Sequence, residues 1–145
     1  MNKRKATKMI ILHCSATKEG QDFKATDIRK WHRAQGWQDI GYHYVIDLDG
    51  TVEVGRNEQY IGAHCNGKNS ISIGICYVGG LDSKGNPIDT RTQEQKTSML
   101  KLVKELLDKY ELTKNDVHCH NEFAKKACPC FNIGTFRKEF EYMFE

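Results

Sequence analysis

The sequence predicts an α/β fold in which helices flank a mixed central β-sheet. Strand-like apolar runs in its first half alternate with helical patterns, and one long amphipathic stretch follows them. No repeat, low-complexity segment or Pro/Gly/Ser-rich linker interrupts the 145 residues, of which 39% are apolar and 28% charged. We therefore expect a single domain spanning residues 1–145, with residues 1–8 flexible.

Four short runs have the composition of strands. They are Met9–Leu12, Tyr42–Asp47, Thr51–Val54 and Ser72–Val78. The first is continuously apolar, as in a buried strand, and it places His13 at its end. Asp49-Gly50 is a hairpin turn signal, so the second and third runs are expected to pair.

Two segments are expected to be helical. In the first, Thr26 is placed to cap a helix that carries Ile28 and Trp31 on one face and ends near Gly36. The second runs from Thr92 to Tyr110 and has the clearest periodicity in the chain. Its apolar stripe consists of Met99, Leu100, Val103, Leu106, Leu107 and Tyr110.

The charge pattern and the N-terminal sequence argue against a nucleic-acid or membrane partner. A formal net charge of +3 is spread along the sequence without dense Lys/Arg clusters, so we expect no nucleic-acid partner. The N-terminus is basic, but the apolar run Met9–Leu12 is too short for a signal peptide or a membrane span. We therefore expect cytoplasmic localisation at synthesis, no membrane insertion and a monomer.

The six cysteines are expected to be reduced, because no secretion signal precedes them. No C-x-x-C motif is present to indicate a structural zinc site, so most of these thiols are expected in the core.

His13, His120 and Cys128 are the candidate metal ligands. Two imidazoles and a thiolate suit zinc, and three protein ligands leave a fourth tetrahedral position open, as in catalytic sites. His120-x-Glu122 also has part of the zinc-deaminase signature, but the second cysteine of P-C-x-x-C is missing. No H-E-x-x-H is present, and a cysteine nucleophile paired with one histidine is the remaining alternative. Spacing alone does not decide among these.

A series of motifs resembles the type-2 N-acetylmuramoyl-L-alanine amidases, which share the peptidoglycan-recognition-protein fold. The motifs are H-C-S-A-T (13–17), W-H-R-A-Q-G-W (31–37), G-Y-H-Y-V-I (41–46), D-G-T-V-E-V-G-R (49–56), S-I-G-I-C-Y-V-G-G (72–80) and K-A-C-P (126–129). They occur in order over roughly residues 13–131, and the chain is most similar to the short phage lysozyme-type members.

The resemblance implies one zinc ion per chain, held by His13, His120 and Cys128. It also implies catalytic roles for Tyr42 and Lys126, with Lys126 stabilising an anion formed in the reaction. His64 aligns with a histidine that lines the substrate groove of relatives. Close relatives often have histidine at position 121 and serine at 130, where this chain has asparagine and cysteine. Trp37 and Tyr44 are expected in the core rather than as sugar-binding platforms.

The function implied is zinc-dependent hydrolysis of the amide between N-acetylmuramic acid and L-alanine in bacterial peptidoglycan. The expected setting is a phage or prophage endolysin that reaches the wall after release, with a recycling enzyme and a delivered toxin as further settings. The alternative is a module that binds peptidoglycan or muropeptides without cleaving them. Such relatives typically lack the cysteine ligand, so Cys128 favours the enzyme.

Overall fold

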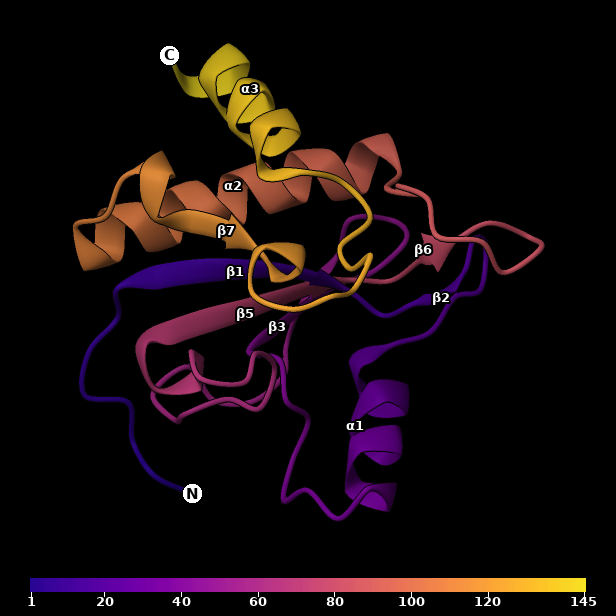
Figure 1. The fold of residues 1–145 in the computed structure, drawn as a ribbon, viewed down its shortest axis with the longest axis horizontal. Helices are drawn as coiled ribbons and strands as arrows, with labels where there is room; N and C mark the ends of the chain where they lie inside the picture. The colour runs from indigo at the N-terminus through magenta and orange to yellow at the C-terminus, as the bar shows by residue number, and fades with distance from the viewer.

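A five-stranded sheet forms the centre of the molecule in the computed structural model, which describes all residues from 1 to 145 (Figure 1). Its order is β4-β3-β5-β1-β7, and β2 and β6 form a separate two-stranded sheet. The strands are β1 (Met9–Cys14), β2 (Thr17–Lys18), β3 (Tyr44–Ile46), β4 (Val52–Val54), β5 (Ser72–Tyr77), β6 (Gly80–Leu81) and β7 (Val117–Cys119). The helices are α1 (Ala25–Ala34), α2 (Gln93–Tyr110) and α3 (Ile133–Phe144), with 3₁₀ turns at Asn69–Ile71, Lys114–Asp116 and His120–Glu122.

The central sheet is mixed, as the sequence predicts. β1 pairs in parallel with both β5 and β7, and β3 pairs in parallel with β5. Only β4 is antiparallel, joined to β3 by the predicted Asp49-Gly50 turn. Since β1 lies between β5 and β7, the residue at its carboxyl end is flanked by two neighbouring strands.

Helices cover both faces of this sheet (Figure 1). α2 and α3 pack on one face over Ile10, Leu12 and the alternate residues of β5, and α1 packs on the other near Val45 and Cys76. Side chains alternate between faces along a strand, so His13, next to Leu12, points to the α1 side. This alternation takes the imidazole out of the main core and toward the α1 side of the sheet.

The predicted start of the first helix is wrong. Thr26 lies inside the first turn of α1, and Lys24 is the capping residue. Asp27 accepts from the Lys24 backbone N–H at 2.8 Å, and Glu53 on β4 accepts from the Ala25 N–H at 2.8 Å. The helix therefore begins at a contact with a residue distant in sequence. By contrast, the predicted helical segment 92–110 is confirmed as α2, and Thr92 caps it by accepting from the Gln95 N–H at 3.0 Å.

The first residues contact the edge of the domain. Arg4 N–H donates to the Gln59 carbonyl at 2.7 Å, and the Asn2 carbonyl accepts from Ile61 N–H at 2.9 Å. The predicted flexibility of residues 1–8 remains a prediction.

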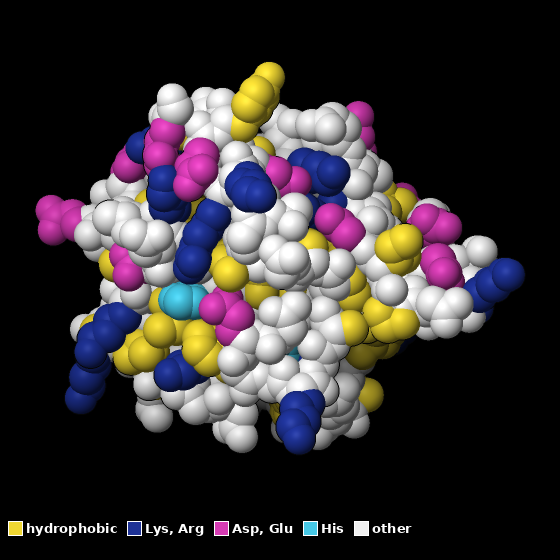
Figure 2. All heavy atoms as spheres, turned by 45° about the horizontal axis from the view of Figure 1, so that its top comes forward, with side chains coloured by type: hydrophobic (Ala, Val, Ile, Leu, Met, Phe, Trp, Pro, Cys, Tyr) yellow, Lys and Arg dark blue, Asp and Glu magenta, His cyan; other side chains and the backbone are white.

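None of the helices combines the length and the apolar character needed to cross a bilayer. On the face shown in Figure 2, basic and acidic side chains are interspersed.

Candidate active site

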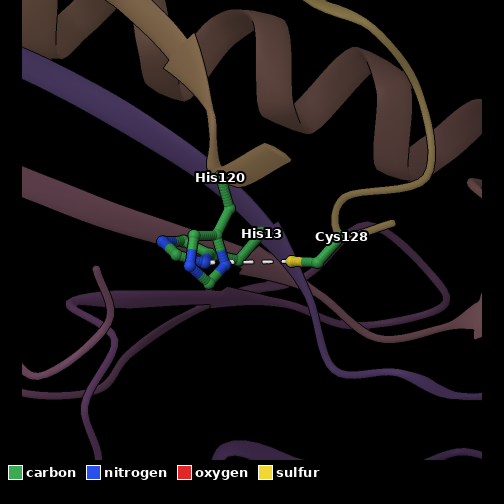
Figure 3. A group of neighbouring side chains, drawn as sticks. All are labelled: His13, His120 and Cys128. Atoms are coloured by element: carbon green, nitrogen blue, oxygen red, sulfur yellow. Dashed lines mark hydrogen bonds between the residues drawn. The ribbon is translucent and has the colours of Figure 1, made fainter. Parts of the chain in front are cut away.

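The three predicted metal ligands meet at one edge of the sheet (Figure 3). His13 lies near the end of β1, His120 follows β7 directly, and Cys128 belongs to the loop that leads to α3. Leu12 is paired with Cys119 in the β1–β7 register, so the residues that follow them emerge side by side. One ligand atom from each of the three side chains lies within 4.8 Å of the other two.

This donor set fits zinc. Two atoms bound to one zinc at about 2.0–2.3 Å with tetrahedral angles lie roughly 3.5 Å apart. The Nδ1 of His13 is 3.9 Å from the Sγ of Cys128, so small side-chain adjustments bring them to that separation. Backbone N–H of Cys14 donates to the same Sγ at 3.2 Å, a contact that stabilises negative charge on sulfur.

Electrostatics keep both imidazoles neutral, the form that binds metals. His13 is fully buried, and burial lowers its pKa well below the usual value, with the charges of His64 and His120 acting in the same direction. Burial also lowers the pKa of His120, and the positive charge of Lys126 lowers it further. Protons therefore compete poorly with a cation at these nitrogens.

The loop that carries Cys128 is held by hydrogen bonds that are buried or partly buried. The Tyr77 hydroxyl donates to the Pro129 carbonyl at 2.7 Å, and the Asn121 side-chain amide donates to the Phe131 carbonyl at 3.0 Å. Tyr77 belongs to the core strand β5, so the loop is anchored directly to the sheet. The sulfur is therefore positioned by the scaffold, although its loop lacks regular structure.

A cavity of about 440 Å³ opens beside these ligands. Its lining comprises His32, Trp37, Tyr42, Ala63, His64, Cys65, Asn66, Asn69, His120, Phe123, Ala124 and Lys126. The structure thus brings the predicted Tyr42, His64 and Lys126 to the same cavity as His120. The ring of Tyr42 lies 5.1 Å from that of His13, and burial raises the pKa of its phenol well above 10. Tyr42 is consequently a hydrogen-bond donor at neutral pH.

The prediction that Trp37 is a core residue is wrong. Its side chain is 38% exposed and lines the cavity, with its ring 4.5 Å from that of His32. The sequence does not indicate this position on the cavity wall, because the exposed fraction of the Trp37 side chain depends on which loops surround it in the fold. His32 also lines the cavity, but its Nδ1 accepts from the Gly41 backbone N–H at 2.9 Å, as suits a structural histidine. Tyr44 packs against the core as predicted.

A His–His–Cys group beside an open cavity, supported by an α/β sheet, has the composition of a catalytic rather than a structural metal site. Comparisons with known proteins agree. The family described as N-acetylmuramoyl-L-alanine amidase matches residues 3–131. The endolysin of Escherichia phage T7 is 47% identical over 130 residues, covering 90% of this chain and 85% of that protein. The endolysin of Enterobacteria phage K11 is 43% identical over 136 residues, covering 94% and 89%.

Solved structures give the same result. The amidase LysC from Clostridium intestinale superposes with a TM-score of 0.80 at 28% identity, covering 93% of this chain and 85% of that one. Peptidoglycan recognition proteins LCa and LCx, solved with bound tracheal cytotoxin, match with a TM-score of 0.73 at 24% identity, which shows a shared fold. The chain belongs to the N-acetylmuramoyl-L-alanine amidase family, and the predicted fold and cell-wall lytic amidase function are confirmed.

Proposed function

We propose that this chain is a zinc-dependent amidase that cleaves the bond between N-acetylmuramic acid and L-alanine in peptidoglycan. The observation that carries the proposal is the meeting of His13, His120 and Cys128 beside the cavity, with their ligand atoms within 4.8 Å of one another. These three residues would hold the ion. When bound, zinc supplies Lewis acidity and makes water reactive at neutral pH.

Lys126 is proposed to stabilise the negative charge that develops on the amide carbonyl oxygen. It is an exposed residue on the cavity wall, and its charge lowers the pKa of both His13 and His120. An ammonium so close to a metal site is unfavourable until an anion forms between them. A donor of this kind typically contributes about 3–4 kcal/mol to the transition state.

Tyr42 is proposed to orient the attacking water and to pass a proton to the leaving amine. Because burial raises the pKa of its phenol, the hydroxyl keeps its proton and acts as a donor. His64, which also lines the cavity, is proposed to contact the stem peptide through the small part of its ring that is accessible.

An endolysin role is proposed from the relatives. Both phage proteins described above are named endolysins, and the alignments cover 85–89% of their lengths. The substrate would then be the peptidoglycan of the bacterial host at the end of the infection cycle.

The decisive experiment incubates purified protein with purified cell walls, with and without a chelator. We expect new N-terminal alanine to appear without new reducing sugar, to stop when metal is removed and to return when zinc is added. A Cys128→Ser variant should release none.

Two results would overturn the proposal. Alanine release that continues in chelator at the full rate would exclude a metal-dependent reaction. Tight binding of walls by the zinc-loaded protein, without any release of alanine, would instead indicate a recognition module.

A further inference from the structure

His64 makes a buried contact that its place on the cavity wall does not explain. Its Nδ1 lies 2.8 Å from the Nε2 of His13, the ring nitrogen that faces away from Cys128. Its Nε2 lies 3.3 Å from the Ser72 hydroxyl, and that hydroxyl donates to the Lys68 carbonyl at 2.7 Å. A continuous chain of polar atoms therefore runs from the metal-ligand group to a backbone carbonyl.

The direction of every hydrogen bond in this series of polar atoms follows from its last member, the Lys68 carbonyl. A carbonyl oxygen only accepts, so the single hydroxyl proton of Ser72 is committed to Lys68. Toward His64 the hydroxyl oxygen can then only accept, which places a proton on the His64 Nε2. No carboxylate bonds to the ring of His13 or His64. A neutral His64 with its proton on Nε2 has an unprotonated Nδ1, which accepts a hydrogen bond from Nε2–H of His13. Neutral His13 is left with a bare Nδ1.

The scaffold is shaped to hold the His64 ring in this position. A Cβ placed on Gly74 would lie 2.6 Å from the His64 ring, and one placed on Gly62 would lie 2.8 Å from it. The backbone of the same loop is fixed because the Asn69 side-chain oxygen accepts from the N–H groups of both His64 and Cys65 at 2.9 Å. The ring thus lies in a slot that two glycines keep open.

We propose that His64, supported by Ser72, is a positioning residue that fixes His13 as the Nε2–H tautomer and so presents Nδ1 as a metal ligand. The proposal rests on the zinc site of the proposed function. Metal-ligating histidines depend on such outer partners, whose loss typically lowers metal affinity about 10- to 100-fold. This role is compatible with a peptide contact at the exposed edge of the same ring.

Two variants of His64 separate the hydrogen bond from the volume of the ring. His64→Leu removes the acceptor, and we expect the zinc Kd, measured by competition with a chelator, to rise about 10- to 100-fold. His64→Asn places an amide oxygen near the former Nδ1 and should recover most of the lost affinity. His43→Asn is the control, because it changes a neighbouring buried histidine whose ring nitrogens contact only the backbone of Tyr60 and Gly74.

Nitrogen-15 NMR of the metal-free wild-type protein tests the tautomer directly. We expect the His13 ring to carry its proton on Nε2, and Ser72→Ala to produce a mixture of tautomers. A proton on Nδ1 in the wild type would overturn the proposal, as would an unchanged zinc Kd in folded His64→Leu. The NMR result needs no metal or turnover, so the tautomer can be confirmed even if the protein fails to bind zinc or cleave peptidoglycan.

Discussion

The two sides of the metal-ligand group differ in burial and charge. The inner side is formed by His13 of strand β1, which is fully buried and contacts His64 of a neighbouring loop. The outer side comes from residues 120–128, where His120 and Cys128 are partly buried and Lys126 is exposed. The difference teaches that the sheet fixes the direction of one ligand, whereas the loop brings the sulfur and the positive charge that the reaction needs.

The largest expected effect tests whether the outer side supplies a ligand that the inner side cannot replace. Cys128→Ser should lose zinc and all measurable alanine release, because serine is a poor zinc ligand. Metal content and turnover are measured on the same preparation. Cys130→Ser is the matched control, since its Sγ contacts the Gly80 carbonyl at 3.2 Å and a hydroxyl can keep that bond. A Cys128→Ser protein with full zinc content would remove this residue from the ligand set.

The sequence predicts the inner side of the metal-ligand group better than the outer side. The apolar run of β1 predicts His13 as a strand-end residue from local pattern alone. His120 and Cys128 follow β7, whose three residues are too few to show a period, so their convergence was indicated only by spacing and resemblance. The contact between His13 and His64 joins residues 51 apart and depends on the packing of a loop against strand β1, which no local pattern contains.

The helices show the same limit. The apolar stripe of α2 is a local feature, and the sequence predicts it correctly. α1 begins one residue before the predicted cap because Glu53, 28 residues away, accepts from the Ala25 N–H. The sequence predicts neither helix α3 nor strand β7, and it predicts a core position for Trp37, which lies on the cavity wall.

The next effect separates charge from metal binding on the outer side. Lys126→Ala should keep zinc while kcat falls about 10²–10³-fold, because the carbonyl oxygen loses a donor in the transition state. Lys125→Ala, the adjacent exposed lysine, should change kcat little. Turnover of Lys126→Ala equal to that of Lys125→Ala would show that the charge near the metal site has no part in the reaction.

A smaller effect is expected for the phenol between the two sides. Tyr42→Phe should retain zinc and lower kcat by roughly 10²-fold, the lower end of the range for proton transfer by a positioned group. The ring remains to pack against His13, so the free energy of unfolding should change little. Tyr44→Phe is the control, because its hydroxyl bonds to Glu58 rather than lining the cavity. An equal kcat in the two variants would reduce Tyr42 to a packing role.

The smallest effect concerns the buried inner side and is a dependence of stability on pH. Burial lowers the pKa of His43 to about 4, whereas the unfolded chain titrates near 6.5. Between these values the unfolded chain binds a proton that the folded chain does not, so the free energy of unfolding falls as the pH falls. For one histidine the slope is about 1.4 kcal/mol per pH unit. Urea unfolding of the wild type and His43→Gln, in chelator at pH 7, 6 and 5, isolates this contribution. The wild type should lose stability faster than the variant by that amount below pH 6.5, and parallel curves would show that His43 is protonated inside the fold.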